Sequence, residues 1–150
     1  MGKTKVLTSQ RDMHASFKKH SSFLKESKGI EPPISHYLLK FYTVECGLKT
    51  LHLINNKAPR KRPTRGTDPE LFNHKLGDLI KKLRISASEI TAIPRFHLKK
   101  DKHDPSISYA IEEVHIAWRY GAILTSQDEQ DLNLWLDKVR ELIEQRLNGG

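Results

Sequence analysis

The sequence predicts an all-α protein, a single helical bundle of four long helices plus one or two short ones, formed by residues 1–150. Two observations indicate this fold class. Apolar residues recur three or four positions apart through most of the chain, which is the spacing of one helix face. The length suits one domain with a substantial core, and no internal repeat or clear linker divides it.

The first two helices are predicted within residues 8–30 and 34–56. Gly29 and the two prolines after it end the first helix. Gly47 interrupts the second helix at a cost of about 1 kcal/mol relative to alanine, so a close helix–helix contact would explain its presence. The second helix has the strongest pattern in the chain, a broad apolar stripe of Tyr37, Leu38, Phe41, Val44, Leu48, Leu51 and Leu53.

Residues 57–67 are predicted to form a basic loop, because Pro59 and Pro63 each remove a backbone donor and the like charges repel one another. A third helix, capped by Thr67 or Asp68, then follows. Its apolar side consists of Leu71, Phe72, Leu76, Leu79, Ile80 and Leu83.

Residues 94–106 are predicted to form a second basic loop, with a short strand at "RFHL" as the alternative. A helical pattern resumes in residues 109–124. The closing helix is expected to begin with a capping box made by Ser126 and Glu129. It is expected to bury Leu132, Trp135, Leu136, Val139, Leu142, Ile143 and Leu147.

The charge of the chain predicts an anionic partner. The formal net charge is +8, and the last 23 residues are acidic, with six Asp/Glu against three Lys/Arg. Nucleic acid is the first expectation, followed by an anionic membrane surface or an acidic protein. A single cysteine, Cys46, suits a reducing compartment, and no apolar run approaches the roughly 20 residues of a membrane span. With no secretory signal at the N-terminus, the expected location is cytoplasmic.

Three clusters occur in order along the chain: Glu45 with Lys49 in "ECGLKTL", His74 opening "HKLGDLIKKL", and Arg119 in "WRYG". Together they resemble the HEPN superfamily of helical bundles over roughly residues 35–124. The resemblance implies helix-mediated pairing and one of two roles, a metal-independent dimeric ribonuclease or a non-catalytic partner in bacterial defence or toxin–antitoxin systems. The ribonuclease members carry an Arg followed at a short, defined interval by a His. That interval is missing here, so the resemblance implies a non-catalytic accessory component.

No catalytic residue is expected, but His115 and Arg119 would serve if the protein were a ribonuclease. They lie four residues apart and share a helix face. A neutral imidazole can take a 2′-hydroxyl proton while a guanidinium holds the phosphate. The structural alternative is that Arg119 pairs with a nearby carboxylate and His115 is half-buried. His74 and Asp78 are likewise one turn apart, a spacing common on helix surfaces.

Neither a metal site nor a cofactor is expected. His97, His103 and Asp104 have no fourth ligand in a recognisable pattern and fit solvated loop residues. The chain has no phosphate-binding glycine loop, no Gly-x-Ser-x-Gly elbow and no paired-cysteine motif. Cys46 fits a core position.

The basic residues predict sequence-independent, salt-sensitive contact with phosphates. The predicted nucleic-acid-binding residues are Arg60, Lys61, Arg62, Arg65, Lys81, Lys82, Lys99 and Lys100. Two alternatives stay open, a solvated surface and a structural adaptor that docks on an acidic protein. A protein partner, in a homodimer or a hetero-complex, is predicted to bind through the helices that carry Trp118 and Trp135.

Overall fold

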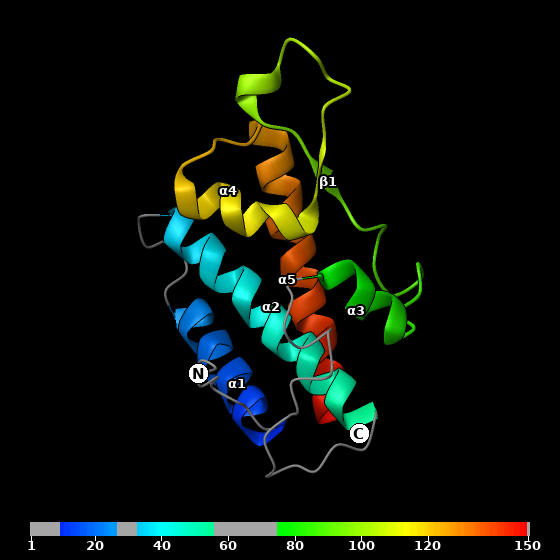
Figure 1. The fold of residues 1–150 in the computed structure, drawn as a ribbon. Coiled ribbons are helices and arrows are strands. Elements are labelled where there is room, and N and C mark those ends of the chain that lie inside the picture. The colour runs from blue at the N-terminus through cyan, green and yellow to red at the C-terminus, as the bar shows by residue number, and fades with distance from the viewer. Residues whose placement is uncertain (1–9, 27–32, 56–74, 150) are drawn as a thin grey trace, which may run out of the picture.

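The computed structural model describes residues 10–26, 33–55 and 75–149, and within this part of the chain helices dominate (Figure 1). The predicted all-α bundle is therefore confirmed. The elements in chain order are α1 (Gln10–Glu26), α2 (Pro33–Asn55), α3 (Leu76–Lys82), β1 (Arg95–Phe96), the 3-10 turn η2 (Lys99–Asp101), β2 (Tyr109–Ala110), the 3-10 turn η3 (Ile111–Glu113), α4 (Val114–Tyr120) and α5 (Ser126–Asn148).

The described helices fall into two lengths. α1, α2 and α5 have 17, 23 and 23 residues, whereas α3 and α4 have seven each. The sequence predicts four long helices, and three are found in the described part of the chain. The expected start of the third helix near Asp68, and the basic loop of residues 57–67, lie outside the described residues.

Helix α2 is the central element, because it packs against α1, α3, α4 and α5. Figure 1 shows it running through the middle of the bundle with α1 and α5 alongside. Its two threonines bond back to the helix: the Thr43 hydroxyl donates to the Leu39 carbonyl at 2.7 Å, and the Thr50 hydroxyl donates to the Cys46 carbonyl at 2.8 Å. A helix surrounded by partners buries polar side chains as well as apolar ones. Those of α2 are Lys40, Thr43, Glu45, Lys49, Thr50 and His52.

The long helices pack closely at Gly47. A Cβ atom built on Gly47 would lie 2.8 Å from two side-chain carbons of Ile143 and 2.9 Å from Phe17. Real Cβ atoms essentially never approach other atoms this closely. The close helix–helix contact suggested by the sequence is therefore present, and it joins α2 to both α1 and α5.

Both tryptophans belong to the core. Trp118 and Trp135 are each only 3% exposed, and their indole N–H groups donate to Glu129 Oε2 at 3.4 Å and to the Thr91 carbonyl at 3.2 Å. Any association through the helices that carry them would therefore use other side chains. The exposed apolar side chains on or beside these helices are Ile116, Tyr120, Ile123 and Leu134.

The segment predicted as an irregular basic loop, residues 94–106, contains regular structure. β1 pairs antiparallel with β2, with Arg95 opposite Ala110 and Phe96 opposite Tyr109. The Phe96 and Tyr109 rings stack with their centroids 5.4 Å apart. The "RFHL" alternative is thus correct for its first two residues. Because Tyr109 belongs to this pair, the helix predicted over residues 109–124 begins only at Val114.

The predicted capping box at the start of α5 is wrong. Thr125, not Ser126, precedes the helix, and its carbonyl accepts the Glu129 N–H at 3.0 Å. The Glu129 carboxylate turns toward Trp118 instead of back to the first turn. The tertiary contact with the indole therefore replaces the local one that the sequence suggests.

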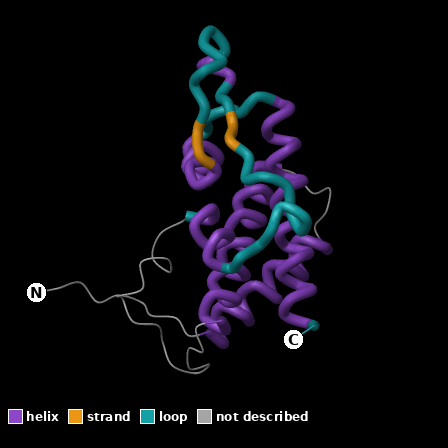
Figure 2. The backbone as a smooth tube through the Cα atoms, turned by 90° about the vertical axis from the view of Figure 1, so that its right-hand side faces the viewer, coloured by secondary structure: helices purple, strands orange, loops and turns teal. Residues whose placement is uncertain are grey.

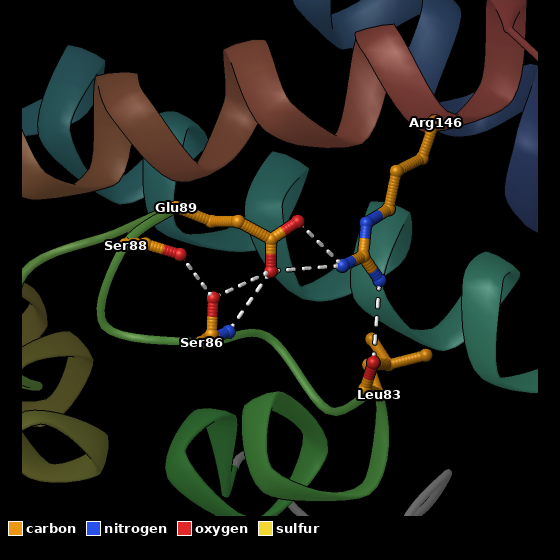
Figure 3. A network of polar contacts seen from close by, with 5 residues as sticks. All are labelled: Leu83, Ser86, Ser88, Glu89 and Arg146. Atoms are coloured by element: carbon orange, nitrogen blue, oxygen red, sulfur yellow. Dashed lines mark hydrogen bonds and ion pairs between the residues drawn. The ribbon is translucent and has the colours of Figure 1, made fainter.

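A polar network joins the segment after α3 to the C-terminal half of α5 (Figure 3). Arg146 donates to both oxygens of Glu89, at 2.9 and 3.2 Å, and to the Leu83 carbonyl at 3.2 Å. Glu89 also accepts the Ser86 N–H at 2.9 Å, and Ser86 bonds to Ser88. The segment that contains Ser86 and Glu89 has no helix or strand, and these hydrogen bonds hold it against α5.

Candidate nucleic-acid interface

The segment between β1 and β2 projects from one end of the bundle as an arm (Figures 1 and 2). We call residues 95–110 the basic hairpin. Strand alternation buries Phe96 and Leu98 and leaves Arg95 and Lys99 exposed. Toward the tip, Lys100, Lys102 and His103 are also exposed. The arm therefore presents cationic side chains on its outer surface.

Both carboxylates of the hairpin are held by neighbouring residues. Asp101 accepts the Tyr109 hydroxyl at 2.7 Å, which raises the pKa of Tyr109. Asp104 accepts the Ser106 hydroxyl at 2.5 Å and its N–H at 3.0 Å, and these bonds lower the pKa of Asp104. Each carboxylate is therefore engaged within the hairpin, whereas the exposed lysine side chains extend into solvent.

The base of the hairpin is tied to the start of α5. Asp128 Oδ2 accepts the His97 N–H at 2.7 Å and lies 2.8 Å from its Nδ1. The His97 carbonyl accepts the Thr125 N–H at 3.0 Å, and the Ile123 carbonyl accepts the Lys99 N–H at 2.8 Å. Burial opposes ionisation of Asp128, yet the bonds from His97 and Thr125 outweigh it and lower its pKa. These contacts set the direction in which the arm projects.

Sequence reasoning missed this anchor. The sequence pattern predicts His97 to be a solvated loop residue, with metal binding as a weak alternative, and gives no sign of a contact with Asp128. The two residues are 31 positions apart, so no local spacing indicates the contact. Among the described residues, no group of three or more His, Cys, Asp or Glu side chains is placed to hold a metal ion.

The predicted nucleic-acid-binding residues do not form one continuous surface in the described part of the chain. Lys81 and Lys82 are exposed at the end of α3, and Lys99 and Lys100 are exposed in η2. Figure 1 shows η2 near the tip of the projecting arm and α3 well below it, beside the body of the bundle. Arg60, Lys61, Arg62 and Arg65 lie outside the described residues.

His115 and Arg119, the residues considered for ribonuclease chemistry, have different environments on α4. His115 is 8% exposed and packs against the rings of Phe41 and Tyr42, with centroid distances of 5.3 and 6.3 Å. Arg119 is exposed, and its guanidinium donates to the Tyr42 hydroxyl and lies 5.9 Å from the Tyr120 ring. Hydrogen bonds with Tyr120 and Tyr42 raise the pKa of Arg119.

The residues that carry the family resemblance lie partly together. Glu45 and Lys49 form an ion pair of 3.7 Å, with side-chain exposures of 8% and 10%. Tyr42, which bonds to Arg119, is on the same side of α2, since residues three and seven positions apart share a helix face. Arg119 of the third cluster thus contacts the side of α2 that carries Glu45 and Lys49 through Tyr42, whereas His74 of the second cluster lies outside the described residues.

The only cysteine in the chain, Cys46, lies in α2 beside α1. Burial raises the pKa of its thiol, and its sulfur is 3.8 Å from the Ser16 hydroxyl. A thiol with a raised pKa is a poor nucleophile at neutral pH. Cys46 is partly buried and packs against the core cluster, so the core position expected from the sequence is only partly met.

Comparison with known proteins gives no relative: no family model, no curated protein and no solved structure matches the chain. None of the described helices is both long and apolar enough to cross a lipid bilayer.

Proposed function

We propose that the protein is a non-catalytic binding component that contacts nucleic-acid phosphates, with the tip of the basic hairpin as its main contact surface. The observation that carries this proposal is the exposure of Lys99, Lys100 and Lys102 on a projecting arm whose two carboxylates are engaged by Tyr109 and Ser106. Ammonium groups are point charges that suit phosphate contact without reading bases.

The anchored base of the hairpin favours such a role. Because Asp128 holds both His97 nitrogen donors, the arm is ordered before any partner arrives, which reduces the entropy lost on binding. Arg60, Lys61, Arg62 and Arg65 are included in the proposed surface on the sequence argument alone. The biological setting, an accessory subunit of a bacterial defence or toxin–antitoxin-like assembly, rests on the HEPN resemblance alone.

The environment of α4 favours a non-catalytic role. A general base must reach the proton that it takes, and the His115 ring is packed among aromatic side chains. The Arg119 guanidinium is directed to the Tyr42 hydroxyl. A phosphodiester at the surface would meet the guanidinium but not the imidazole.

Fluorescence anisotropy with labelled single-stranded RNA, single-stranded DNA and duplex DNA of equal length tests the binding proposal. We expect binding that differs little between sequences and weakens steeply as salt rises from about 50 to 200 mM. The proposal would be contradicted if none of the three probes bound at about 50 mM salt. The protein concentration in this test should exceed the dissociation constants typical of non-specific binding, roughly 10⁻⁶–10⁻⁴ M.

Incubation of the purified protein with the RNA probe in a metal chelator tests the non-catalytic part. We expect the RNA to stay intact. Cleavage that is abolished by His115→Ala or Arg119→Ala would overturn this part and establish a metal-independent ribonuclease. The binding assay is independent of this result.

A further inference from the structure

A polar hollow of about 280 Å³ lies between α1 and the C-terminal end of α5, away from the basic hairpin. Its volume is just below the range for small-molecule sites, which is roughly 300–1,000 Å³. Its described lining includes Phe17, Lys18, Ser21, Lys25, Glu144 and Leu147.

Ser21 is the unusual member of this lining. The side chain is only 4% exposed, and its Oγ forms no hydrogen bond with any described residue. Buried hydroxyl groups nearly always have a partner, and a serine in a helix commonly finds one in the preceding turn. Because Ser21 lines the hollow, its unpaired hydroxyl is a candidate hydrogen-bond partner for a ligand there.

The charges around the hollow favour an anion. Two lysines, Lys18 and Lys25, belong to the lining, against one acidic residue, Glu144. That carboxylate is already paired, since Glu144 Oε1 lies 3.2 Å from Lys25 Nζ and 3.2 Å from Arg140 Nη1. With Glu144 paired in this way, Lys18 is the cationic residue of the lining that this carboxylate does not engage.

The hollow also has an apolar side. Phe17 and Leu147 contribute to it from α1 and α5, and Phe17 belongs to the hydrophobic core. We propose that this hollow binds a small organic phosphate. The phosphate would interact with Lys18, Lys25 and the Ser21 hydroxyl, and the apolar part of the ligand would pack on Phe17 and Leu147. This proposal does not depend on nucleic-acid binding by the hairpin.

Isothermal titration calorimetry with AMP, adenosine and inorganic phosphate tests the proposed ligand class. We expect AMP to bind, inorganic phosphate to bind more weakly because it leaves the apolar side empty, and adenosine not to bind. Absence of AMP binding at millimolar concentration would overturn the proposal. Adenosine binding as tightly as AMP would also overturn it, because the phosphate would then contribute nothing.

Two substitutions test the residues. Ser21→Ala removes a hydroxyl without a partner, so the melting temperature of the free protein should not fall, while AMP affinity should fall about tenfold. Lys18→Ala should lower the affinity for AMP by a similar factor. Lys19→Ala is the matched control, because Lys19 is an exposed neighbour on α1 outside the lining. Equal loss of affinity in the two lysine variants would indicate general attraction to a basic protein and would overturn the site.

Discussion

At the scale of single residues, Gly47 is the position where the absence of a side chain matters most. Phe17 of α1 and Ile143 of α5 both occupy the space next to its Cα atom. The atoms that a new methyl group would meet belong to core side chains from two different helices. The position is therefore constrained from two sides at once.

Gly47→Ala is expected to destabilise the protein. Alanine would gain about 1 kcal/mol in helix propensity, but overpacking a close contact costs about 1–3 kcal/mol, and contact with two side chains places this site at the upper end. Urea unfolding should show a net loss of about 1–2 kcal/mol. Gly77→Ala is the control, since its Cβ would meet only the end of the Glu112 side chain at 3.2 Å and Ile93 at 3.5 Å. A Gly47→Ala variant as stable as the wild type would show that the helices are not packed this closely.

Glu89 should make stability dependent on pH in the acidic range. The Ser86 N–H and then Arg146 lower the pKa of Glu89 below its ordinary value of 4.5. A carboxylate with a lower pKa in the folded state stabilises the protein above its unfolded-state pKa, and this stabilisation is lost as pH falls through the folded-state pKa. The melting temperature of Glu89→Gln should therefore lie below that of the wild type at pH 7, and the two should converge below about pH 4.

Glu141→Gln is the control for this pH series, because Glu141 is an exposed carboxylate on the same helix as Arg146. Its melting temperature should follow that of the wild type across the range. A gap between wild type and Glu89→Gln that stays constant from pH 7 to pH 3 would show that ionisation of Glu89 is not what stabilises the network.

At the scale of elements, the basic hairpin depends on contacts outside itself. β1 and β2 have only two residues each, and so short a pair is marginally stable on its own in water. The hairpin gains further stability from the stacked rings of Phe96 and Tyr109 and from the hydrogen bonds that join His97 to Asp128. Asp128 is therefore the residue on which the order of the arm depends most.

Asp128→Ala should loosen the hairpin while leaving the bundle intact. The substitution removes the acceptor for the His97 backbone N–H and its ring, so amides in residues 95–110 should exchange faster with deuterium. Exchange in α1 and α2 should not change. Asp131→Ala is the matched control, because Asp131 bonds within its own helix to Gln127 and not to the hairpin. Equal protection of residues 95–110 in both variants would show that the anchor is dispensable.

Association with a partner stays a prediction, and the structure makes it more specific. Ile123 and Leu134 are 62% and 54% exposed and line a hollow of about 340 Å³ next to Tyr37. If the helices that carry Trp118 and Trp135 associate, Ile123→Ser with Leu134→Ser should shift the mass measured by sedimentation toward the monomer without lowering the melting temperature. A wild-type protein that is monomeric at high concentration and recovers no partner would contradict the prediction.

The sequence predicts the long helices more accurately than the short elements, because the signals for long helices are local. Periodic apolar residues and terminating prolines located α1, α2 and α5 to within a few residues, because these signals are local. The hairpin was mostly missed, since Arg95–Phe96 and Tyr109–Ala110 are short and find each other across an intervening loop. The start of α5 was misassigned because Trp118, rather than the helix terminus, determines where Glu129 points.

At the scale of the whole molecule, contacts distant in sequence determine where the charged side chains lie. Glu89 and Arg146 are 57 residues apart, and His97 and Asp128 are 31 apart, so neither pair could be recognised from spacing. The candidate site is predicted as a set of basic residues, of which Lys81, Lys82, Lys99 and Lys100 are exposed; their contact with nucleic acid stays a prediction. The sequence does not predict that Lys81 and Lys82 lie on the body of the bundle while Lys99 and Lys100 lie on the arm, because this separation depends on how far the hairpin projects (Figure 2).

The salt dependence of nucleic-acid binding tests the central claim most directly. Replacing Lys99, Lys100 and Lys102 with Ser should flatten the slope of log affinity against log salt by roughly 0.7–0.9 for each phosphate that the variant no longer binds, similarly for all sequences. The matched control replaces Arg11, Lys19 and Lys138, three exposed basic residues on α1 and α5, and removes the same charge. The account predicts a flatter slope for the hairpin variant and a slope close to that of the wild type for the control. Equal slopes for both variants would contradict the assignment of the hairpin as the nucleic-acid contact surface.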